Sequence, residues 1–320
     1  MKGSYRDEKA RGIGEVPVEA LVGTRWPRVS IVVPAFRQVD ALSKCLAALA
    51  RQTYPGRRYE VIVVDNGSPL DPTATARGNL QLRFARECRP GSYAARNRGI
   101  VLARGSIIGF TDADCVPTDT WIESGVRALL ENSGTEVVGG RVTVFPEDET
   151  RLTAVELHQL IRAFPQDGFV RSLKFATTAN LFTYRRTFER IGGFEAQLMS
   201  GGDAEWGQRF HAAGGRILYS ELAEVKHPAR RTLRQLIRQR RRTMGGRFQR
   251  RQGVGHPPHP LDGTDFSYNS PFRRVAQHAS HALLSRPRDM LRFGTVELLL
   301  YAVAKLEMAR LSLGGKPARR

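Results

Sequence analysis

Cysteine is scarce in this chain of 320 residues, which contains only Cys45, Cys88 and Cys115. Three scattered thiols are too few for a disulfide framework, and no pair has the CxxC spacing of a metal site. The cysteine usage favours a reducing compartment, and we expect a cytoplasmic protein. The charged N-terminal residues lack the apolar core of a signal peptide. The sequence also lacks an apolar run of the roughly 20 residues that a membrane-spanning helix needs.

Lysine is also rare, because only seven of the 50 basic side chains are lysines and the rest are arginines. Acidic side chains number 31, so the formal net charge is +19. Such an excess points to a polyanionic partner, an anionic membrane surface or a phosphorylated substrate, without choosing among them. Arginine favours phosphate in particular, because its planar guanidinium can donate two parallel hydrogen bonds.

Buried strands and amphipathic helices alternate along the first 131 residues. The expected strands are residues 29–34, 59–64 and 106–111, with a weaker one at 80–84. The expected helices are residues 40–51 with Asp40 as N-cap, a helix that follows Gly91 and Ser92 and runs to Ala103, and residues 118–131. Strand–helix–strand alternation predicts an open α/β sheet, in which ligands bind at the carboxyl ends of the strands.

The pattern changes beyond residue 135. The expected strands there are residues 136–145, 175–184 and 216–219, and the expected helices are residues 150–164 and 203–213. Residues 230–251 contain ten arginines and no acid, and their apolar positions predict an amphipathic helix. The Pro- and Gly-containing residues 252–275 indicate a linker, and a final helix is expected at 289–313.

Acidic side chains follow two of the predicted strands. Asp112 and Asp114 come directly after residues 106–111, and Asp65 ends the strand at 59–64. Two carboxylates two residues apart can approach one divalent cation, and oxygen ligands favour Mg²⁺ or Mn²⁺. An acid such as Asp65 can accept hydrogen bonds from a ribose hydroxyl or a base. Solvated turn residues are the alternative interpretation of each acid.

Three other groups carry candidate chemistry. Arg96 lies in a helix opening, where phosphate is attracted, and a solvated helix face is the alternative interpretation. Asp203 follows two glycines and either caps the next helix or acts as a general base, with Glu205 and Trp206 lining an acceptor pocket. His227 is either structural or completes a metal site begun by the two aspartates.

In this order the motifs closely resemble family 2 glycosyltransferases with the GT-A fold, over roughly residues 28–250. The resembling segments are VSIVVPAFRQ, YEVIVVDNGS, GSYAARNRGI, IIGFTDADC, TTANLFTYRRTFERIGGFEA, SGGDAEWGQRFHAAGGRI and VKHPARRT. The resemblance implies a Rossmann-like, open mixed α/β sheet flanked by helices. It implies an inverting, metal-dependent transfer of a sugar from a nucleotide-sugar, by family habit a UDP-sugar, to a hydroxyl of a polysaccharide, glycolipid or lipid-linked saccharide.

The resemblance also assigns roles to individual residues. The nucleotide-sugar would be held by Pro34, Ala35, Phe36, Asp65, Arg96 and Asp112. Mn²⁺ or Mg²⁺ would be held by Asp112, Asp114 and His227, and the acceptor or sugar would face Asn180, Glu205 and Trp206. Asp203 falls where the family has its catalytic base, although Gly202 replaces the acid that usually precedes it.

Four regions follow from these assignments. They are an N-terminal tail (1–28), a nucleotide-sugar-binding half (29–135), an acceptor-binding half (136–228) and a basic, helical C-terminal extension (229–320). We hypothesise that the extension faces the inner side of an anionic membrane, because each base near such a surface contributes about 1 kcal/mol. The alternative is a scaffold whose final helix packs on the sheet.

Two other classes of function stay open. A polyanion- or nucleic-acid-binding protein would explain the positive charge, but no zinc-finger or RNP signature appears and aromatic residues are not interleaved with the arginines. Nucleic acid is therefore a disfavoured partner. A nucleotidyltransferase would also use acids and a metal. The GGDAEW segment followed by His227 favours a glycosyltransferase over it, because it resembles an acceptor-base arrangement.

Overall fold

Eight strands form one open sheet in the computed structural model, which describes residues 26–68, 80–254 and 270–318. In chain order they are β1 (Val29–Ala35), β2 (Tyr59–Asp65), β3 (Leu82–Arg86), β4 (Ile107–Thr111), β5 (Val116–Pro117), β6 (Thr135–Phe145), β7 (Asn180–Tyr184) and β8 (Arg216–Pro228). Their order across the sheet is β3-β2-β1-β4-β7-β6-β8-β5. The strands from β3 to β4 are parallel, whereas β7 is antiparallel to both its neighbours. The predicted mixed sheet is confirmed.

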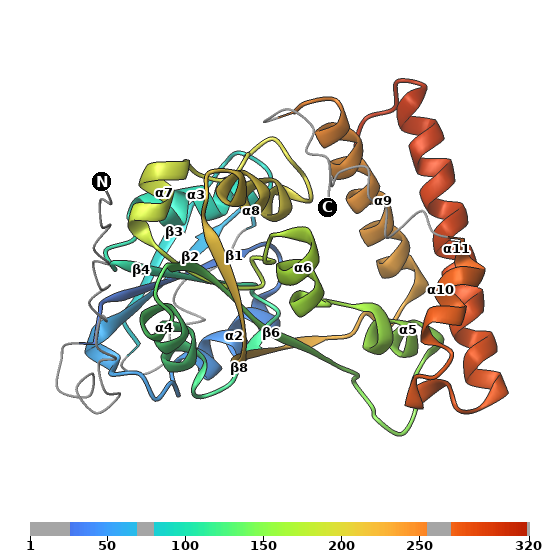
Figure 1. Cartoon of the computed structure of the whole chain (residues 1–320), viewed down its shortest axis with the longest axis horizontal. Helices are drawn as coiled ribbons and strands as arrows, with labels where there is room; N and C mark the ends of the chain where they lie inside the picture. Colours follow the sequence, from blue (N-terminus) through green and yellow to red (C-terminus); the bar gives the residue numbers. More distant parts are fainter. Residues whose placement is uncertain (1–25, 69–79, 255–269, 319–320) are drawn as a thin grey trace, which may run out of the picture.

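Helices cover both faces of the sheet, and a further group of helices lies beside it (Figure 1). Those near the sheet are α2 (Val39–Leu49), α3 (Ser92–Leu102), α4 (Trp121–Glu131), α6 (Gln166–Leu173), α7 (Arg185–Ile191) and α8 (Gly202–Ala212), with the short 3-10 turn η1 (Gly56–Arg58). Those beside it are α5 (Ala154–Arg162), α9 (Leu233–Arg251), α10 (Pro271–His278), the 3-10 turn η4 (Ala282–Leu284) and α11 (Pro287–Ser312). The predicted helical C-terminal extension is thus present.

The central strand β1 is buried on both faces. Side chains alternate across a strand, so Ile31 and Val33 pack in a cluster with α2 and α4, while Val32 packs with α3 and α8. All three are fully buried. A continuous β-branched run is what a strand with two covered faces requires. The two clusters fix the sheet and, with it, the loops at its carboxyl edge.

Several boundaries differ from those expected. Asp40 is not the N-cap of α2, because Gln38 occupies that position and Asp40 lies in the first helical turn. The strand expected at 216–219 continues to Pro228, since β8 resumes its pairing with β6 after an irregularity between Gly140 and Arg141. Much of β8 is exposed, so its sequence lacks the apolar alternation that marks a strand.

The expected linker at 252–275 runs into a helix. Pro271 opens α10 at a position where proline is favoured, since its missing N–H has no partner there in any helix. Residues 255–269 of this linker lie outside the described residues, as do residues 1–25 of the expected tail.

The final helix packs on other helices and not on the sheet. Its main neighbours are α9, α5 and α10, so the alternative of a final helix packed on the sheet does not describe this structure. Although α11 is 26 residues long, charged side chains such as Glu297 and Lys305 interrupt its apolar residues. Among the described residues, no helix is long and apolar enough to cross a membrane.

Candidate active site

The carboxyl ends of the parallel strands bring the first group of expected residues together. In β1, Pro34 and Ala35 pair with Val64 and Asp65 of β2, so both strands end at the same edge of the sheet. A cavity of about 200 Å³ opens there. Its lining residues are Pro34, Ala35, Phe36, Asn66, Pro90, Gly91, Ser92, Met199 and Arg242. Three residues expected to hold a nucleotide-sugar therefore line one cavity, which we call the strand-edge cavity.

Two polar side chains shape the loop after β2. The Oδ1 atom of Asp65 accepts hydrogen bonds from the backbone N–H of Ser68 at 3.0 Å and from its hydroxyl. The side-chain amide of Asn66 donates to the carbonyls of Glu87 and Arg89, and its oxygen accepts from the N–H of Gly91 at 2.8 Å. Asn66 thus ties the loop that leads into α3.

A series of polar contacts along α3 connects Asp112 to Asp203. The guanidinium of Arg96 is buried and forms an ion pair with Asp112. It lies over the ring of Tyr93, with its carbon 5.4 Å from the ring centroid. The Tyr93 hydroxyl donates to Oδ1 of Asp203 at 3.0 Å. Burial and the charge of Asp203 raise the pKa of Tyr93, so its hydroxyl stays protonated and remains a donor.

The structure also brings Asp114 and His227 together. The His227 Nε2 atom lies 3.7 Å from Oδ1 of Asp114. Its Nδ1 lies 2.8 Å from the Pro228 carbonyl oxygen, which can only accept, so Nδ1 carries the hydrogen and Nε2 keeps its lone pair. One carboxylate oxygen and one imidazole nitrogen in this arrangement fit a divalent cation, with the carbonyl orienting the ring.

Two neighbours of this pair differ in their relation to it. The thiol of Cys115 lies close enough to join Asp114 and His227 around one ion, and burial raises the pKa of this thiol. Asp112, expected as a ligand, lies outside this group because its carboxylate is held by Arg96. The described residues therefore bring two of the three expected ligands together.

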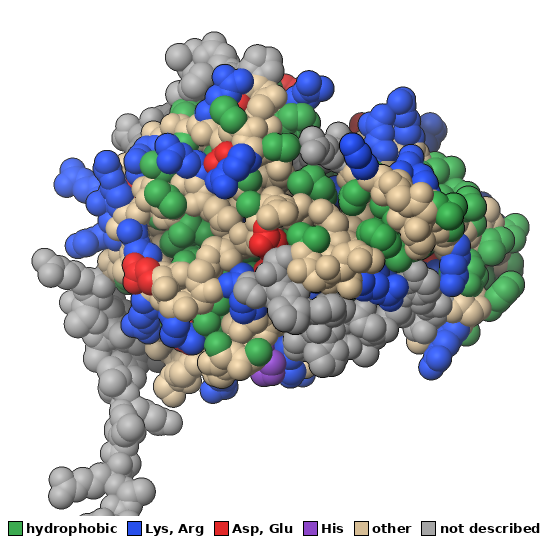
Figure 2. Space-filling view, turned by 90° about the horizontal axis from the view of Figure 1, so that it is seen from above, with side chains coloured by type: hydrophobic (Ala, Val, Ile, Leu, Met, Phe, Trp, Pro, Cys, Tyr) green, Lys and Arg blue, Asp and Glu red, His purple; other side chains and the backbone are tan. Residues whose placement is uncertain are grey.

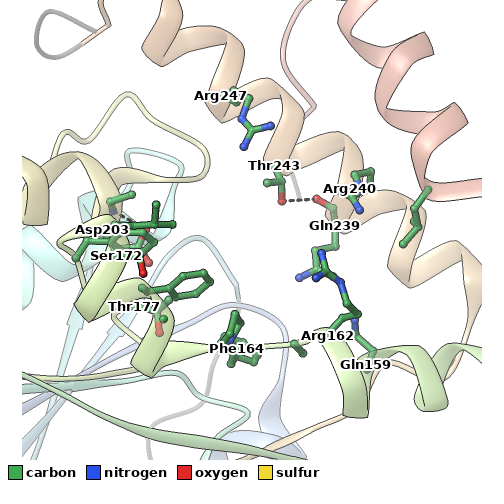
Figure 3. A pocket seen from close by; sticks show the side chains of 18 of the residues that line it. Gln159, Arg162, Phe164, Ser172, Thr177, Asp203, Gln239, Arg240, Thr243 and Arg247 are labelled. Atoms are coloured by element: carbon green, nitrogen blue, oxygen red, sulfur yellow. Dashed lines mark hydrogen bonds between the residues drawn. The ribbon is translucent and has the colours of Figure 1, made fainter. Parts of the chain in front are cut away.

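A larger cavity, of about 600 Å³, lies between the sheet domain and α9 (Figure 3). We call it the inter-helix cavity. Asp203 and Thr177 lie on one side of it, and Arg240 and Arg247 of α9 lie on the other. Asp203 reaches it from the first turn of α8, and its Oδ1 also accepts from the N–H of Ala204 at 3.0 Å. Both recorded hydrogen bonds thus involve Oδ1.

Phe164 connects this cavity to the Asp114–His227 pair. It lines the cavity, and its ring lies 4.7 Å from the His227 ring, centroid to centroid. Its φ of 51° places it in the left-handed region, which is costly for a residue with a side chain. A strained residue persists only where the surrounding structure holds it in place, and such residues concentrate at functional sites.

Comparison with known proteins identifies the family. A family model described as glycosyl transferase family 2 matches residues 30–197, which is more than half of the chain. The chain belongs to this family. Family membership favours glycosyl transfer over the polyanion-binding and nucleotidyltransferase alternatives that the sequence left open.

Individual relatives agree with this assignment. Glycosyltransferase AglE of Haloferax volcanii is 37% identical over 212 residues, which cover 64% of this chain and 68% of that protein. The pre-mycofactocin glycosyltransferase of Mycobacterium tuberculosis is 25% identical over 247 residues, 72% of this chain, and the chain spans only 51% of its length. A mannosyltransferase from Pyrobaculum calidifontis, solved in complex with GDP-Man and Mn²⁺, superposes with a TM-score of 0.61. The superposition covers 89% of this chain and 88% of the mannosyltransferase, at 19% sequence identity. It shows that the fold is of the GT-A type.

In this glycosyltransferase, α9 packs directly on the loop that precedes α8 and Asp203. A Cβ at Gly246 would lie 2.1 Å from the Ser200 carbonyl oxygen, so only glycine permits the contact. Gln249 donates to the Gln197 carbonyl at 3.1 Å. The Arg-rich helix, left outside the assigned site by the sequence interpretation, is therefore a wall of the inter-helix cavity. The adjacent glycines in TMGGRF were the available signal.

Three side chains expected to face the acceptor or sugar do not line either cavity. Asn180 is fully buried, donates to the carbonyls of Arg141 and Ala223, and accepts from the Trp121 indole. It therefore joins β6, β7 and β8, and its amide has no hydrogen left for a sugar.

The other two belong to the far side of α8. Trp206 is fully buried among aromatic rings, including Phe188 and Phe194, and its indole N–H donates to the Gly192 carbonyl. Glu205 is buried and pairs with Arg209 one helical turn later. Only Asp203 and Ala204 of the GGDAEW segment reach the inter-helix cavity, because a helix directs consecutive side chains to different faces.

We predict that Gly246→Ala slows sugar transfer and lowers the free energy of unfolding by about 1–3 kcal/mol, because the added methyl forces α9 away from Ser200. Gly294→Ala in α11 is the matched control, since its Cβ would meet only Val275 at 3.7 Å. Replacing that helical glycine should stabilise the protein by about 0.5–1 kcal/mol. Urea unfolding and transfer assays check both. Equal effects of the two substitutions would contradict the close contact.

Proposed function

We propose that the enzyme transfers a sugar with inversion from a nucleotide-sugar, in the presence of Mn²⁺ or Mg²⁺, to a hydroxyl of a saccharide acceptor. The observation that carries the proposal is the position of Asp203. Its carboxylate is oriented by Tyr93 and Ala204 and faces a cavity of about 600 Å³. A carboxylate held in this way suits general-base chemistry on an acceptor hydroxyl.

The donor fits the strand-edge cavity. Pro34, Ala35 and Phe36 line it, and Asp65 closes the turn beside it, where an acid can receive a base or ribose. Arg242 of α9 adds a positive charge to the same cavity. The likeness to a mannosyltransferase in complex with GDP-Man supports a nucleotide-sugar, and the motif resemblance favours UDP as its nucleotide.

Asp114 and His227 would hold the cation. Bound there, a divalent ion supplies positive charge that stabilises a departing nucleoside diphosphate. Near the proposed cation, the buried guanidinium of Arg96 holds the Asp112 carboxylate in place.

Asp203 would act on the opposite reactant. Both of its recorded hydrogen bonds involve Oδ1, so Oδ2 is the oxygen we assign to the acceptor proton. A base that removes this proton while the hydroxyl attacks the anomeric carbon opposite the leaving group completes one displacement. A single displacement inverts the configuration at that carbon.

We expect UDP to bind in a Mn²⁺-dependent manner and Asp114→Asn to remove this dependence, weakening binding by roughly tenfold or more, because a carboxylate ligand is lost. Calorimetric titration of UDP with and without Mn²⁺ measures the effect. Asp119→Asn, which removes an exposed acid five residues later, should bind as the wild type does. Absence of binding for UDP, GDP, dTDP and CDP alike would reject the nucleotide-sugar proposal.

Asp203→Asn should lower the rate of sugar transfer by about 10²–10⁴, because an amide cannot accept the acceptor proton. Nucleotide binding should be unchanged, since the amide oxygen still accepts from Tyr93 and Ala204. Asp167→Asn on α6 removes a half-exposed acid that does not line the cavity and serves as control. Normal turnover by a folded Asp203→Asn variant would exclude this residue as the base.

We also propose that α11 rests on an anionic membrane surface, which suits a lipid-linked acceptor. Leu291, Leu298, Leu306 and Leu313 recur seven or eight residues apart, so they share one face of the helix, and each is more than half exposed. Hydrophobic and basic side chains are intermixed at this end of the molecule (Figure 2). Such a face combines apolar insertion with attraction to acidic headgroups.

The membrane proposal predicts that the protein sediments with vesicles containing phosphatidylglycerol at low salt and less with neutral vesicles. The double variant Leu298→Glu/Leu306→Glu should lose most of this binding, because it places two acids on the exposed face. Val101→Glu/Leu130→Glu, which changes exposed apolar residues on α3 and α4, is the control. Equal losses in both double variants, or no sedimentation of the wild type, would contradict a specific membrane face.

A further inference from the structure

One face of α9 carries a row of arginines into the inter-helix cavity. Arg240, Arg247 and Arg250 lie seven and three residues apart, which places them on one side of the helix, and all three line the cavity. Arg162 joins them from the end of α5. In Figure 3 the guanidinium groups of Arg162, Arg240 and Arg247 lie across the cavity from Asp203. Among the described lining residues, four arginines thus surround a space with one carboxylate on its wall.

A buried carboxylate lies behind the wall that carries Arg162. Glu297 is fully buried, and its carboxylate lies 3.2 Å from Arg162, 3.0 Å from Arg274 and 3.1 Å from His158. One carboxylate is therefore shared by two arginines and by a histidine whose pKa burial lowers. Burial and the charges of Arg274, Arg162 and Arg247 lower the pKa of Arg240 to about 10, an effect that Glu297 opposes only in part.

The remaining walls suit a sugar. Phe164, Phe169 and Leu236 give the cavity apolar surface between its charged groups. Its volume of about 600 Å³ is typical of sites for small ligands. Such a space admits a sugar ring together with a charged substituent.

We propose that this cavity binds an acceptor that carries a phosphate group, with Arg162, Arg240 and Arg247 holding the phosphate oxygens and Asp203 facing the acceptor hydroxyl. The proposal rests on the glycosyl transfer proposed above and specifies its acceptor. Guanidinium groups are the usual partners of phosphate, since they donate paired hydrogen bonds and keep their charge when partly buried.

A different arginine lines the cavity assigned to the donor. Among the described residues, the strand-edge cavity and the inter-helix cavity share no lining residue. Arg242, two residues after Arg240 and therefore on another side of α9, lines the strand-edge cavity. The helix thus supplies different arginines to the two cavities, one set for each proposed reactant.

The test is a calorimetric titration of glucose 1-phosphate and of methyl α-glucoside into the full chain, with UDP and Mn²⁺ at saturation to occupy the donor site. We expect the phosphate ester to bind at least roughly tenfold more tightly than the neutral glycoside. Inorganic phosphate should compete with it. In Arg240→Gln/Arg247→Gln, the preference for the ester should be lost, while methyl α-glucoside binds as before.

Arg234→Gln/Arg238→Gln is the matched control, because it removes two exposed arginines from the same helix. It should keep the preference for the phosphate ester. Equal weakening in both double variants would show that the preference for the phosphate ester comes from overall charge, which would contradict the proposal. Absence of any preference in the wild type would also overturn it. If the cavity double variant does not fold, the single variant Arg240→Gln should still lose part of the preference.

Titration of UDP alone separates this proposal from the one on which it rests. Weakened UDP binding by Arg240→Gln/Arg247→Gln would place these arginines at the donor and overturn the assignment to the acceptor. Failure of the wild type to bind any nucleotide would instead reject the proposed glycosyl donor, whatever the outcome with glucose 1-phosphate.

Discussion

The candidate active site depends on how closely the ring of Tyr93 approaches Gly202. A Cβ at this glycine would lie 2.8 Å from the ring, so no larger residue fits unless the ring moves. The contact lets the Tyr93 hydroxyl reach Asp203. Gly246 of α9 packs against Ser200, two residues before Gly202. The close approach of Tyr93 also gives a physical reason for a glycine at position 202, where the motif resemblance implies an acid: the space for a side chain is filled by Tyr93.

The C-terminal extension follows from the same packing. Because α9 touches the loop at Ser200, it is held at a fixed distance from Asp203 and closes the inter-helix cavity. Without α9, the carboxylate would face open solvent, where a general base has less control over the acceptor. The extension therefore supplies seven of the 22 described residues that line the proposed acceptor cavity.

The sequence predicted best what is local. The strand end at Asp65 and the loop that carries Asp114 were recognisable because short, largely apolar runs precede them, and such runs need burial on both faces. The burial of Asn180 and the pairing of Asp112 with Arg96 could not be predicted, since both depend on contacts between different helices and strands. The insertion of β7 between β4 and β6 is of the same kind, because nothing in residues 180–184 fixes their neighbours.

The two faces of α11 connect the charge of the cavity to the outer surface. Glu297 and Glu307 point inward, where they pair with Arg162 and with Arg241 of α9. These ion pairs hold the basic helices together despite their mutual repulsion. The exposed leucines lie on the opposite side of the same helix. A surface that binds this face would therefore lie one helix layer from α9, so that only α11 separates the proposed membrane contact from the proposed phosphate-binding arginines.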